Sequence, residues 1–333
     1  MKIKTAILSQ EKKLVSDFLE KFDLQYDTDV DTTLYIEDND QIFGTISKSK
    51  HIIKCLAVDP SYQSENLASK LITKLIEILQ SENIFYYQVF TKPIYESLFK
   101  SMGFQLLAKS DKIIAMEAGN PNIYTTISNL KNQIRLQYGE DIFKTKIASI
   151  VMNANPLTNG HLFLIERASK ENDLVLVFIL EEEKSLFSFK ERFALAYAAT
   201  RLYSNVMILP STRYIISKDT FPNYFLKEVN EHAKEYAKID VRIFKDYFMP
   251  ELSIDNRYVG SETDSLMKIY NDTLKEELGE KLIVVERLKD DEEIISASLV
   301  RKLILDNQVE ESLKYLPKGT HFLIISMAYD KSR

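Results

Sequence analysis

The sequence predicts an α/β protein with two domains in series, an α+β domain followed by a doubly wound domain with a parallel sheet. Three observations support this prediction. The chain has 333 residues, which is long for one compact domain. Hydrophobic residues make up 45% of it, so each half can bury a core of its own. Strand-like and helix-like segments occur in both halves, and a Gly-Asn-Pro break after residue 118 separates them.

The first half mixes short apolar strands with helices. One helix is clearly amphipathic, because Leu67, Leu71, Leu75 and Ile78 recur on one face. The expected helices are 10–22, 67–79 and 95–101, and the expected strands are 33–37, 41–47, 52–58, 85–90 and 112–117.

Residues Ala118-Gly119-Asn120-Pro121 interrupt this pattern. The next segment has apolar residues at helical spacing from Ile123 to Tyr138 and ends at Gly139, which predicts a connecting helix. The predicted organisation is therefore a first domain at 1–120, a connecting helix at 121–143 and a second domain at 144–333.

The second half alternates strands and helices in a regular way. The expected strands are 146–152, 174–180, 206–209, 257–259 and 282–285, and the expected helices are 161–170, 190–203, 224–236, 265–278 and 298–305. The first strand is an unbroken apolar run, as is typical of strands buried on both faces. This alternation predicts a Rossmann-like, doubly wound parallel sheet with its site at the carboxyl ends of the strands.

Charge and cysteine content exclude several classes of protein. The net charge of −6 argues against a nucleic-acid binder that relies on a broad basic face. Cys55 is the only cysteine, so no disulfide can form within the chain, and its apolar surroundings predict a buried strand residue. No apolar run is long enough to cross a membrane, and Met1–Thr5 lacks the apolar core of a signal peptide. We therefore expect a cytoplasmic protein without a membrane partner.

The chemistry is expected in the turn that follows strand 146–152. There a buried strand leads through a polar turn into a helix that opens near His161, so backbone N–H groups and the positive end of a helix dipole can meet phosphates. Thr158 adds a hydroxyl donor, and Gly160 leaves room for close approach of a phosphate. His161 adds a donor that can become cationic. The remaining expected ATP-binding residues of this turn are Asn153, Asn155 and Pro156.

A second segment also offers groups that can bind phosphate: Ile295-Ser296-Ala297-Ser298-Leu299-Val300-Arg301. Either Ser296 or Ser298 can cap a helix and offer donors to a triphosphate, and Arg301 can neutralise that triphosphate. A structural helix cap alone would explain the serines, but it would not explain their pairing with the first turn.

Together these two segments resemble the nucleotidyltransferase superfamily, with its (T/H)-x-G-H loop and its late I-S-x-x-x-V-R segment. The resemblance implies further site residues. Lys184, after the second strand, would approach the substrate, although a solvated lysine beside three glutamates is an open alternative. Gly260 and Glu262 match the G-x-D/E turn that lies near the nucleotide.

Residues 1–120 resemble a GNAT acetyltransferase domain. The strand end at Val58, followed by Gln63, Asn66 and Ala68, matches the strand and the Q/R-x-x-G-x-G/A loop that hold the pyrophosphate of coenzyme A. Asn66 stands where glycine is usual, but asparagine tolerates a positive φ better than most residues. We expect this loop to bind a CoA-like group.

A GNAT-like domain followed by this nucleotidyltransferase domain resembles the citrate lyase ligase family over nearly the whole chain. The resemblance implies an AMP-forming acid–thiol ligase that uses ATP and Mg²⁺, with His161, Thr158 and Arg301 as catalytic residues and no residue as a metal ligand. It implies acetate as substrate and, as partner, a citrate lyase acyl-carrier subunit whose phosphoribosyl-dephospho-CoA thiol becomes acetylated.

Three alternatives remain open from the sequence. One is a generic adenylyltransferase of the pantetheine-phosphate type, and another is a GNAT acetyltransferase that uses acetyl-CoA. The third is a regulatory module with vestigial sites, against which the intact Thr158, Gly160, His161, Ser298 and Arg301 argue.

Overall fold

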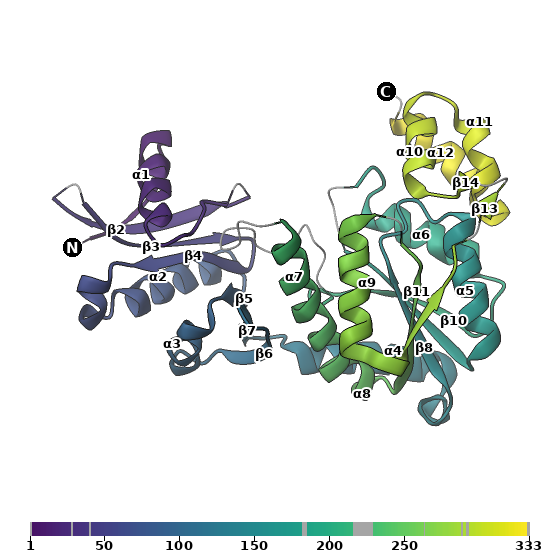
Figure 1. Ribbon diagram of the computed structural model, residues 1–333, viewed down its shortest axis with the longest axis horizontal. Helices are drawn as coiled ribbons and strands as arrows, with labels where there is room; N and C mark the ends of the chain where they lie inside the picture. Colours follow the sequence, from purple (N-terminus) through teal and green to yellow (C-terminus); the bar gives the residue numbers. More distant parts are fainter. Residues whose placement is uncertain are drawn as a thin grey trace. The chain divides into compact units, whose positions relative to one another are not determined.

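The computed structural model describes residues 2–27, 29–39, 41–181, 185–215, 229–262, 264–287, 289–290 and 293–331. Its contacts divide the chain into two compact units: unit 1 comprises 1–125 and 218–242, and unit 2 comprises 126–217 and 243–333. Each unit contains its own large sheet (Figure 1). The units differ from the sequence-derived domains chiefly in assigning 218–242 to unit 1, and the domain boundaries at 120 and 144 stay a prediction.

Unit 1 is an α+β structure around a seven-stranded sheet with the order β1-β2-β3-β4-β5-β7-β6. Its neighbouring strands are antiparallel except β4 and β5, which are parallel. The strands are β1 (Lys2–Thr5), β2 (Thr32–Asp38), β3 (Gln41–Ser49), β4 (Ile52–Val58), β5 (Tyr86–Thr91), β6 (Gln105–Lys109) and β7 (Ile114–Gly119), and the helices are α1 (Ser9–Glu20), α2 (Leu67–Ser81) and α3 (Glu96–Ser101).

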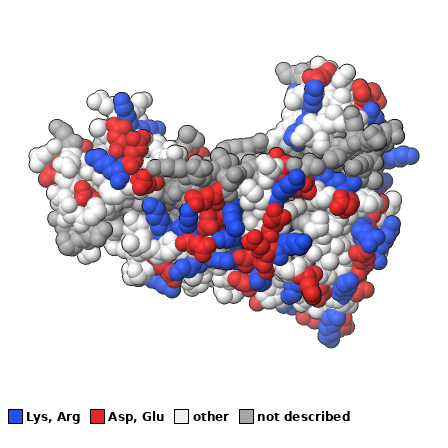
Figure 2. All heavy atoms as spheres, in the orientation of Figure 1, with Lys and Arg blue, Asp and Glu red and all other residues white. Residues whose placement is uncertain are grey.

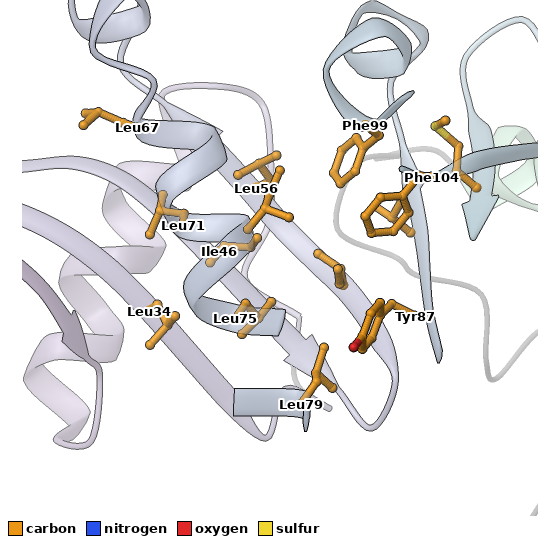
Figure 3. Packing of buried hydrophobic residues seen from close by; sticks show 14 of the residues in the cluster. Leu34, Ile46, Leu56, Leu67, Leu71, Leu75, Leu79, Tyr87, Phe99 and Phe104 are labelled. Carbon is orange, nitrogen blue, oxygen red and sulfur yellow. The ribbon is translucent and has the colours of Figure 1, made fainter. Parts of the chain in front are cut away.

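The core of unit 1 lies between its sheet and helix α2. The apolar face predicted for this helix is the one that is buried, with Leu71 and Leu75 fully enclosed against Ile46 of β3 (Figure 3). Figure 1 shows α1 on the opposite face of the sheet from α2. Near α3, the rings of Phe99 and Phe104 meet edge to face with centroids 5.1 Å apart. Burial of these side chains supplies the main driving force for folding this unit.

Two irregularities shape the middle of this sheet. Strands β4 and β5 pair only through Ile52–Gln88 and Ile53–Val89, so the carboxyl half of β4 is not paired with β5. In addition, Cys55 has φ +52° where the register of β4 against β3 shifts, which is the geometry of a β-bulge. Cys55 is buried, as predicted, and burial raises the pKa of its thiol to about 12.

Helix α7 (Val229–Ile243) packs on the turn between β6 and β7 through residues that belong to unit 1. The buried carboxylate of Glu235 accepts a hydrogen bond from the Ser110 hydroxyl and another, at 3.1 Å, from the backbone N–H of Lys112. Lys238 forms an ion pair with Asp111 at 2.7 Å. These contacts explain why a segment from the second half of the sequence clusters with the first unit.

Unit 2 is doubly wound around a five-stranded sheet with the order β10-β9-β8-β11-β12, in which all neighbours are parallel. Its strands are β8 (Ile147–Met152), β9 (Leu174–Ile179), β10 (Val206–Pro210), β11 (Ile254–Gly260) and β12 (Leu282–Val285), and a small hairpin is formed by β13 (Lys289–Asp290) and β14 (Glu293–Ile294). The helices are α4 (Ile123–Tyr138), α5 (Asn159–Glu171), α6 (Phe189–Thr200), α8 (Met249–Glu251), α9 (Ser265–Leu278), α10 (Ala297–Leu305), α11 (Val309–Ser312) and α12 (His321–Lys331).

Both faces of this sheet are covered. Val177 of β9 packs in a cluster with Ile165 of α5 and Ala196 of α6. The next residue, Phe178, points to the other face and meets the rings of Phe244 and Phe248 edge to face at 6.1 and 6.0 Å. Alternation of this kind is what an apolar strand buried on both sides requires.

The order of the strands fixes the position of the site. The chain runs from β8 to β9 and β10 on one side and then returns to β11 and β12 on the other side of β8. The reversal lies between β8 and β11, and ligands of doubly wound sheets bind outside the carboxyl ends of the strands at this point.

The α/β class and the Rossmann-like parallel sheet are confirmed. No helix in the described part of the chain is long and apolar enough to cross a membrane. Among the residues coloured in Figure 2, Lys and Arg side chains lie next to Asp and Glu side chains over the face shown, rather than in one broad basic area.

Candidate active site

The turn after β8 is compact because its centre is buried. Ala154 adopts φ +50°, the peptide bond between Asn155 and Pro156 is cis, and Leu157 is fully buried in the core beside β8 and α5. Helix α5 then begins at Asn159. Helix α5 thus begins a short turn beyond the carboxyl end of β8, the strand at the switch point of the sheet.

His161 and Thr158 are joined at the first turn of α5. Thr158 is the N-cap residue, and its backbone N–H donates to Nδ1 of His161 at 3.0 Å, with the Thr158 hydroxyl 2.9 Å from the same nitrogen. Because Nδ1 is an acceptor, the neutral imidazole carries its proton on Nε2. Desolvation on burial, followed by the positive charge of Arg287, lowers the pKa of His161 from 6.5 to about 4. Without a bound anion His161 is therefore a neutral Nε2–H donor at neutral pH.

The two predicted segments meet beside Gly160. A β-carbon built on it would lie 3.4 Å from the carbonyl oxygen of Ile295 and 3.6 Å from the Thr158 hydroxyl oxygen. Residues about 135 apart in the sequence are thus in van der Waals range across one small space. These are ordinary contact distances, so the protein itself does not require glycine here.

Helix α10 contributes the second segment. Ser296 is its N-cap residue, and the Ser296 hydroxyl accepts from the backbone N–H of Leu299 at 3.2 Å, which decides between the two serines as the cap. Ser298 lies in the first turn, where its hydroxyl accepts from Nη2 of Arg301 at 2.9 Å. Nη1 of Arg301 donates to the carbonyl oxygen of Asn155 at 2.7 Å. Arg301 thereby ties α10 to the turn after β8, and desolvation lowers the pKa of its guanidinium.

A second arginine holds the other end of this turn. Arg192 of α6 is fully buried and donates to the carbonyl oxygens of Asn153 at 2.7 Å and Phe187 at 3.2 Å. The backbone N–H of Phe187 in turn donates to the Asn155 side-chain oxygen at 3.2 Å. Two arginines thus fix backbone carbonyls of one turn, and such positioning reduces the reorganisation needed when a ligand binds.

The carboxyl ends of β11 and β12 complete the site. Arg287, which follows β12, is a site residue that the sequence analysis missed. Gly260 is the last residue of β11, next to β8 in the sheet, and Glu262 follows it. Glu262 forms an ion pair with Arg287, which lies two residues beyond β12. The signal in the sequence was a lone arginine just after an apolar strand, in a sheet whose carboxyl edge carries the chemistry.

The structure thus brings Asn153, Asn155, Pro156, Thr158, Gly160 and His161 together with Ser296, Ser298 and Arg301, and it places Gly260 and Glu262 at the adjoining strand end. Lys184 lies outside the described residues.

The residues predicted to bind a CoA-like group belong to unit 1. Val58 ends β4, and Ala68 lies in the first turn of α2, both packed against the core of that unit. Asn66 precedes α2 with φ +54° and ψ +32°, a left-handed conformation that asparagine tolerates better than most residues. Gln63 lies in the 3₁₀ turn Pro60–Glu65, and the position of its side chain is outside the described part of the chain.

Comparison with known proteins agrees with this arrangement. The family model of the citrate lyase ligase C-terminal domain matches residues 147–324, and that of the acetyltransferase (GNAT) domain matches residues 9–113. A citrate (pro-3S)-lyase ligase of Escherichia coli strain K12 is 31% identical over 332 residues, which covers 95% of this chain and 91% of the relative. The chain belongs to the citrate lyase ligase family.

Other relatives are consistent with this membership. The citrate (pro-3S)-lyase ligase of Haemophilus influenzae is 32% identical over 326 residues, covering 94% of this chain and 96% of the relative. A phosphopantetheine adenylyltransferase of Clostridium botulinum strain Eklund 17B is 39% identical, but only over 66 residues, or 19% of this chain and 42% of that protein. The citrate lyase ligases therefore match this chain along nearly its whole length, whereas the adenylyltransferase matches only a short part of it.

Proposed function

We propose that this chain is an AMP-forming acid–thiol ligase that activates acetate with ATP and transfers the acetyl group to a thiol. A carboxylate oxygen of acetate attacks the α-phosphorus, the bond to pyrophosphate breaks, and acetyl-AMP forms. A thiolate then attacks the acetyl carbonyl carbon and AMP leaves. The thiol belongs to the phosphoribosyl-dephospho-CoA-type group on the acyl-carrier subunit of citrate lyase.

The observation that carries this proposal is the meeting of the two predicted segments at the carboxyl end of β8. The Arg301–Asn155 hydrogen bond and the short distance between Gly160 and Ile295 place the first turns of α5 and α10, with their hydroxyl groups and one imidazole, next to each other. These groups can donate hydrogen bonds, which suits stabilisation of negative charge on a polyphosphate. The curated relatives that match nearly the full chain bear the name citrate (pro-3S)-lyase ligase.

Each residue has a definite part in the proposed reaction. The Nε2–H of His161 and the N-terminus of α5 face the phosphate oxygens on which charge builds up during attack. Thr158 orients the imidazole through Nδ1. Arg301 is primarily a positioning residue, because it holds the turn at Asn155, and its charge adds to the positive potential of the site.

Mg²⁺ is proposed to enter with ATP rather than to reside in the protein. Within the described residues, no group of three or more His, Cys, Asp or Glu side chains is placed to hold a metal ion. In nucleotide sites, phosphate oxygens and water commonly supply most of the ligands of Mg²⁺. The ion would neutralise part of the phosphate charge.

The GNAT-like unit is proposed to hold the CoA-like arm of the carrier. Two features support this role: the left-handed Asn66 keeps the loop before α2 in the conformation that glycine would adopt, and β4 is unpaired with β5 beyond Ile53. The arm, not acetyl-CoA, is the expected ligand, because unit 2 would make its own activated acetyl group.

Pyrophosphate–ATP exchange tests the proposal. Exchange of labelled pyrophosphate into ATP should require acetate, and the nucleotide product should be AMP rather than ADP. Adding the deacetylated carrier should raise steady-state AMP release well above the rate with acetate alone, because acetyl-AMP would otherwise stay in the site. ADP formation, or AMP release indifferent to both acetate and carrier, would refute the ligase assignment.

A pantetheine-phosphate-type adenylyltransferase is the second candidate, and the short match to a phosphopantetheine adenylyltransferase favours it. In that case exchange would depend on a phosphorylated acceptor and not on acetate. If acetyl-CoA replaced ATP plus acetate as the acetyl donor, the GNAT acetyltransferase alternative would be correct instead.

A further inference from the structure

Arg287 occupies a place in the site that neither predicted segment explains. Strands β11 and β12 pair in parallel with Gly260 opposite Val285, so the residue two positions after β12 lies beside the turn that follows β11. Nε of Arg287 donates to the Ser261 carbonyl oxygen at 2.5 Å, and its backbone N–H donates to the Ser261 hydroxyl at 3.2 Å. Its Nη2 pairs with Glu262. The guanidinium is thus held over the end of β11, the strand next to β8.

The charge of Arg287 acts on the first turn of α5. Besides burial, this charge is the cause that lowers the pKa of His161. The Arg287 side chain remains 30% exposed although it is paired with Glu262. Among the described residues, the side-chain bonds of Arg287 engage Nε and Nη2, so Nη1 is placed to donate to a further oxygen anion such as a phosphate.

We propose that Arg287 is a further ATP-binding residue of the adenylyl-transfer site and that Ser261 and Glu262 position its guanidinium to receive phosphate oxygens of ATP. This inference rests on the proposed function, because it requires the nucleotide to lie over the carboxyl ends of β8 and β11. Glu262 then acts through Arg287, as a positioning residue. If the ion pair served only to join β11 to β12, its loss would lower the stability of the protein without changing its affinity for ATP.

The test uses the full chain with Mg²⁺ and ATP in the absence of acetate. Calorimetric titration should show Arg287→Ala weakening ATP binding by about 10- to 100-fold, as expected for loss of a charge-assisted hydrogen bond. Arg287→Lys should recover part of the affinity, because it keeps the charge and loses the fork. Arg167→Ala is the matched control, since it removes another arginine–glutamate pair, with Glu171, whose arginine side chain is 59% exposed. It should bind ATP like the wild type.

A second measurement does not depend on activity. The imidazole of His161, assigned with His161→Gln among the four histidines, can be titrated by NMR in the wild type and in Arg287→Ala. The His161 pKa should rise in Arg287→Ala and stay low in Arg287→Lys. An unchanged His161 pKa in Arg287→Ala would show that the charge does not act at this site and would overturn the inference.

The outcomes separate this inference from the proposed function. If Arg287→Ala folds and binds ATP as tightly as the wild type, the inference fails whatever the exchange assay shows. If ATP binding depends on Arg287 but acetate-dependent exchange is absent in the wild type, the inference stands and the ligase assignment fails. Should Arg287→Ala not fold, Arg287→Lys decides: a loss of affinity at unchanged thermal stability supports the inference, and wild-type affinity refutes it.

Discussion

Replacing Gly160 by alanine should separate stability from activity. Gly160 is the second residue of α5, and the backbone there has no left-handed φ that would require glycine. The added methyl group would lie 3.4 Å from the Ile295 carbonyl oxygen and 3.6 Å from the Thr158 hydroxyl, which are ordinary contacts. Alanine is also the better helix former, by up to about 1 kcal/mol. The variant should therefore be as stable as the wild type or slightly more stable.

Activity should change in the opposite direction. If a phosphate approaches the backbone at Gly160, the methyl group displaces it by on the order of 1 Å, and a misplacement of that size can cost about 100-fold in rate. The assay is acetate-dependent pyrophosphate–ATP exchange, with thermal denaturation of the same samples as the control. We expect exchange to fall by roughly 100-fold while the midpoint of unfolding is unchanged or raised.

Two results would refute this reasoning. Exchange within a few-fold of the wild type would show that no phosphate comes close to Gly160, so this glycine would have no part in the reaction. A clear fall in the unfolding midpoint would show that the space beside Ile295 is needed by the protein itself. In that case a loss of activity would say nothing about ATP.

The other predictions concern three residues. His161→Ala should lower exchange about 100- to 1000-fold without unfolding the protein, because it removes one preorganised donor. Because the pKa of His161 is about 4, kcat/KM for ATP should show no inflection from this group between pH 5.5 and 8, and it should fall only toward pH 4, where a proton on Nδ1 breaks the hydrogen bond from the Thr158 N–H that orients the ring. Arg301→Ala should lower kcat/KM by an amount that corresponds to roughly 1.5–3 kcal/mol of transition-state stabilisation. Lys302→Ala, at an exposed position, should have no effect on kcat/KM. Asn66→Ala should destabilise unit 1 by about 1 kcal/mol in urea unfolding because Asn66 is left-handed, and Asn66→Gly should not.

Most of the fold was predictable because long apolar segments decide it. Strands β4 and β12 and helix α9 have the bounds that the sequence predicted, since each is delimited by turn residues or by the ends of an apolar pattern. Two strands of unit 1, β1 and β6, were missed. Strand β1 is short and exposed, and β6 is held at the sheet edge by pairing with β7, so neither has the alternating pattern of a half-buried strand.

The site was predictable only where its residues are close in sequence or occur in a known segment. Thr158, Gly160 and His161 share one turn, so their proximity follows from helix geometry. Arg287 could not be found this way, because its place depends on β12 pairing with β11 and on the contact with Ser261. The neutral state of His161 was also beyond the sequence, because it depends on burial of the imidazole and on the charge of Arg287, which lies beyond β12.

The arginines explain why so polar a turn can be rigid. Arg192 and Arg301 donate to the carbonyls of Asn153 and Asn155, on either side of the buried Ala154. Because side chains satisfy these carbonyls, the turn does not need neighbouring backbone N–H groups as their donors, and those at the start of α5 can be directed at a ligand. Arg301→Lys should therefore be nearly as harmful as Arg301→Ala, since an ammonium group lacks the fork that reaches both Asn155 and Ser298. Recovery of most activity by Arg301→Lys would instead mean that Arg301 acts through its charge alone.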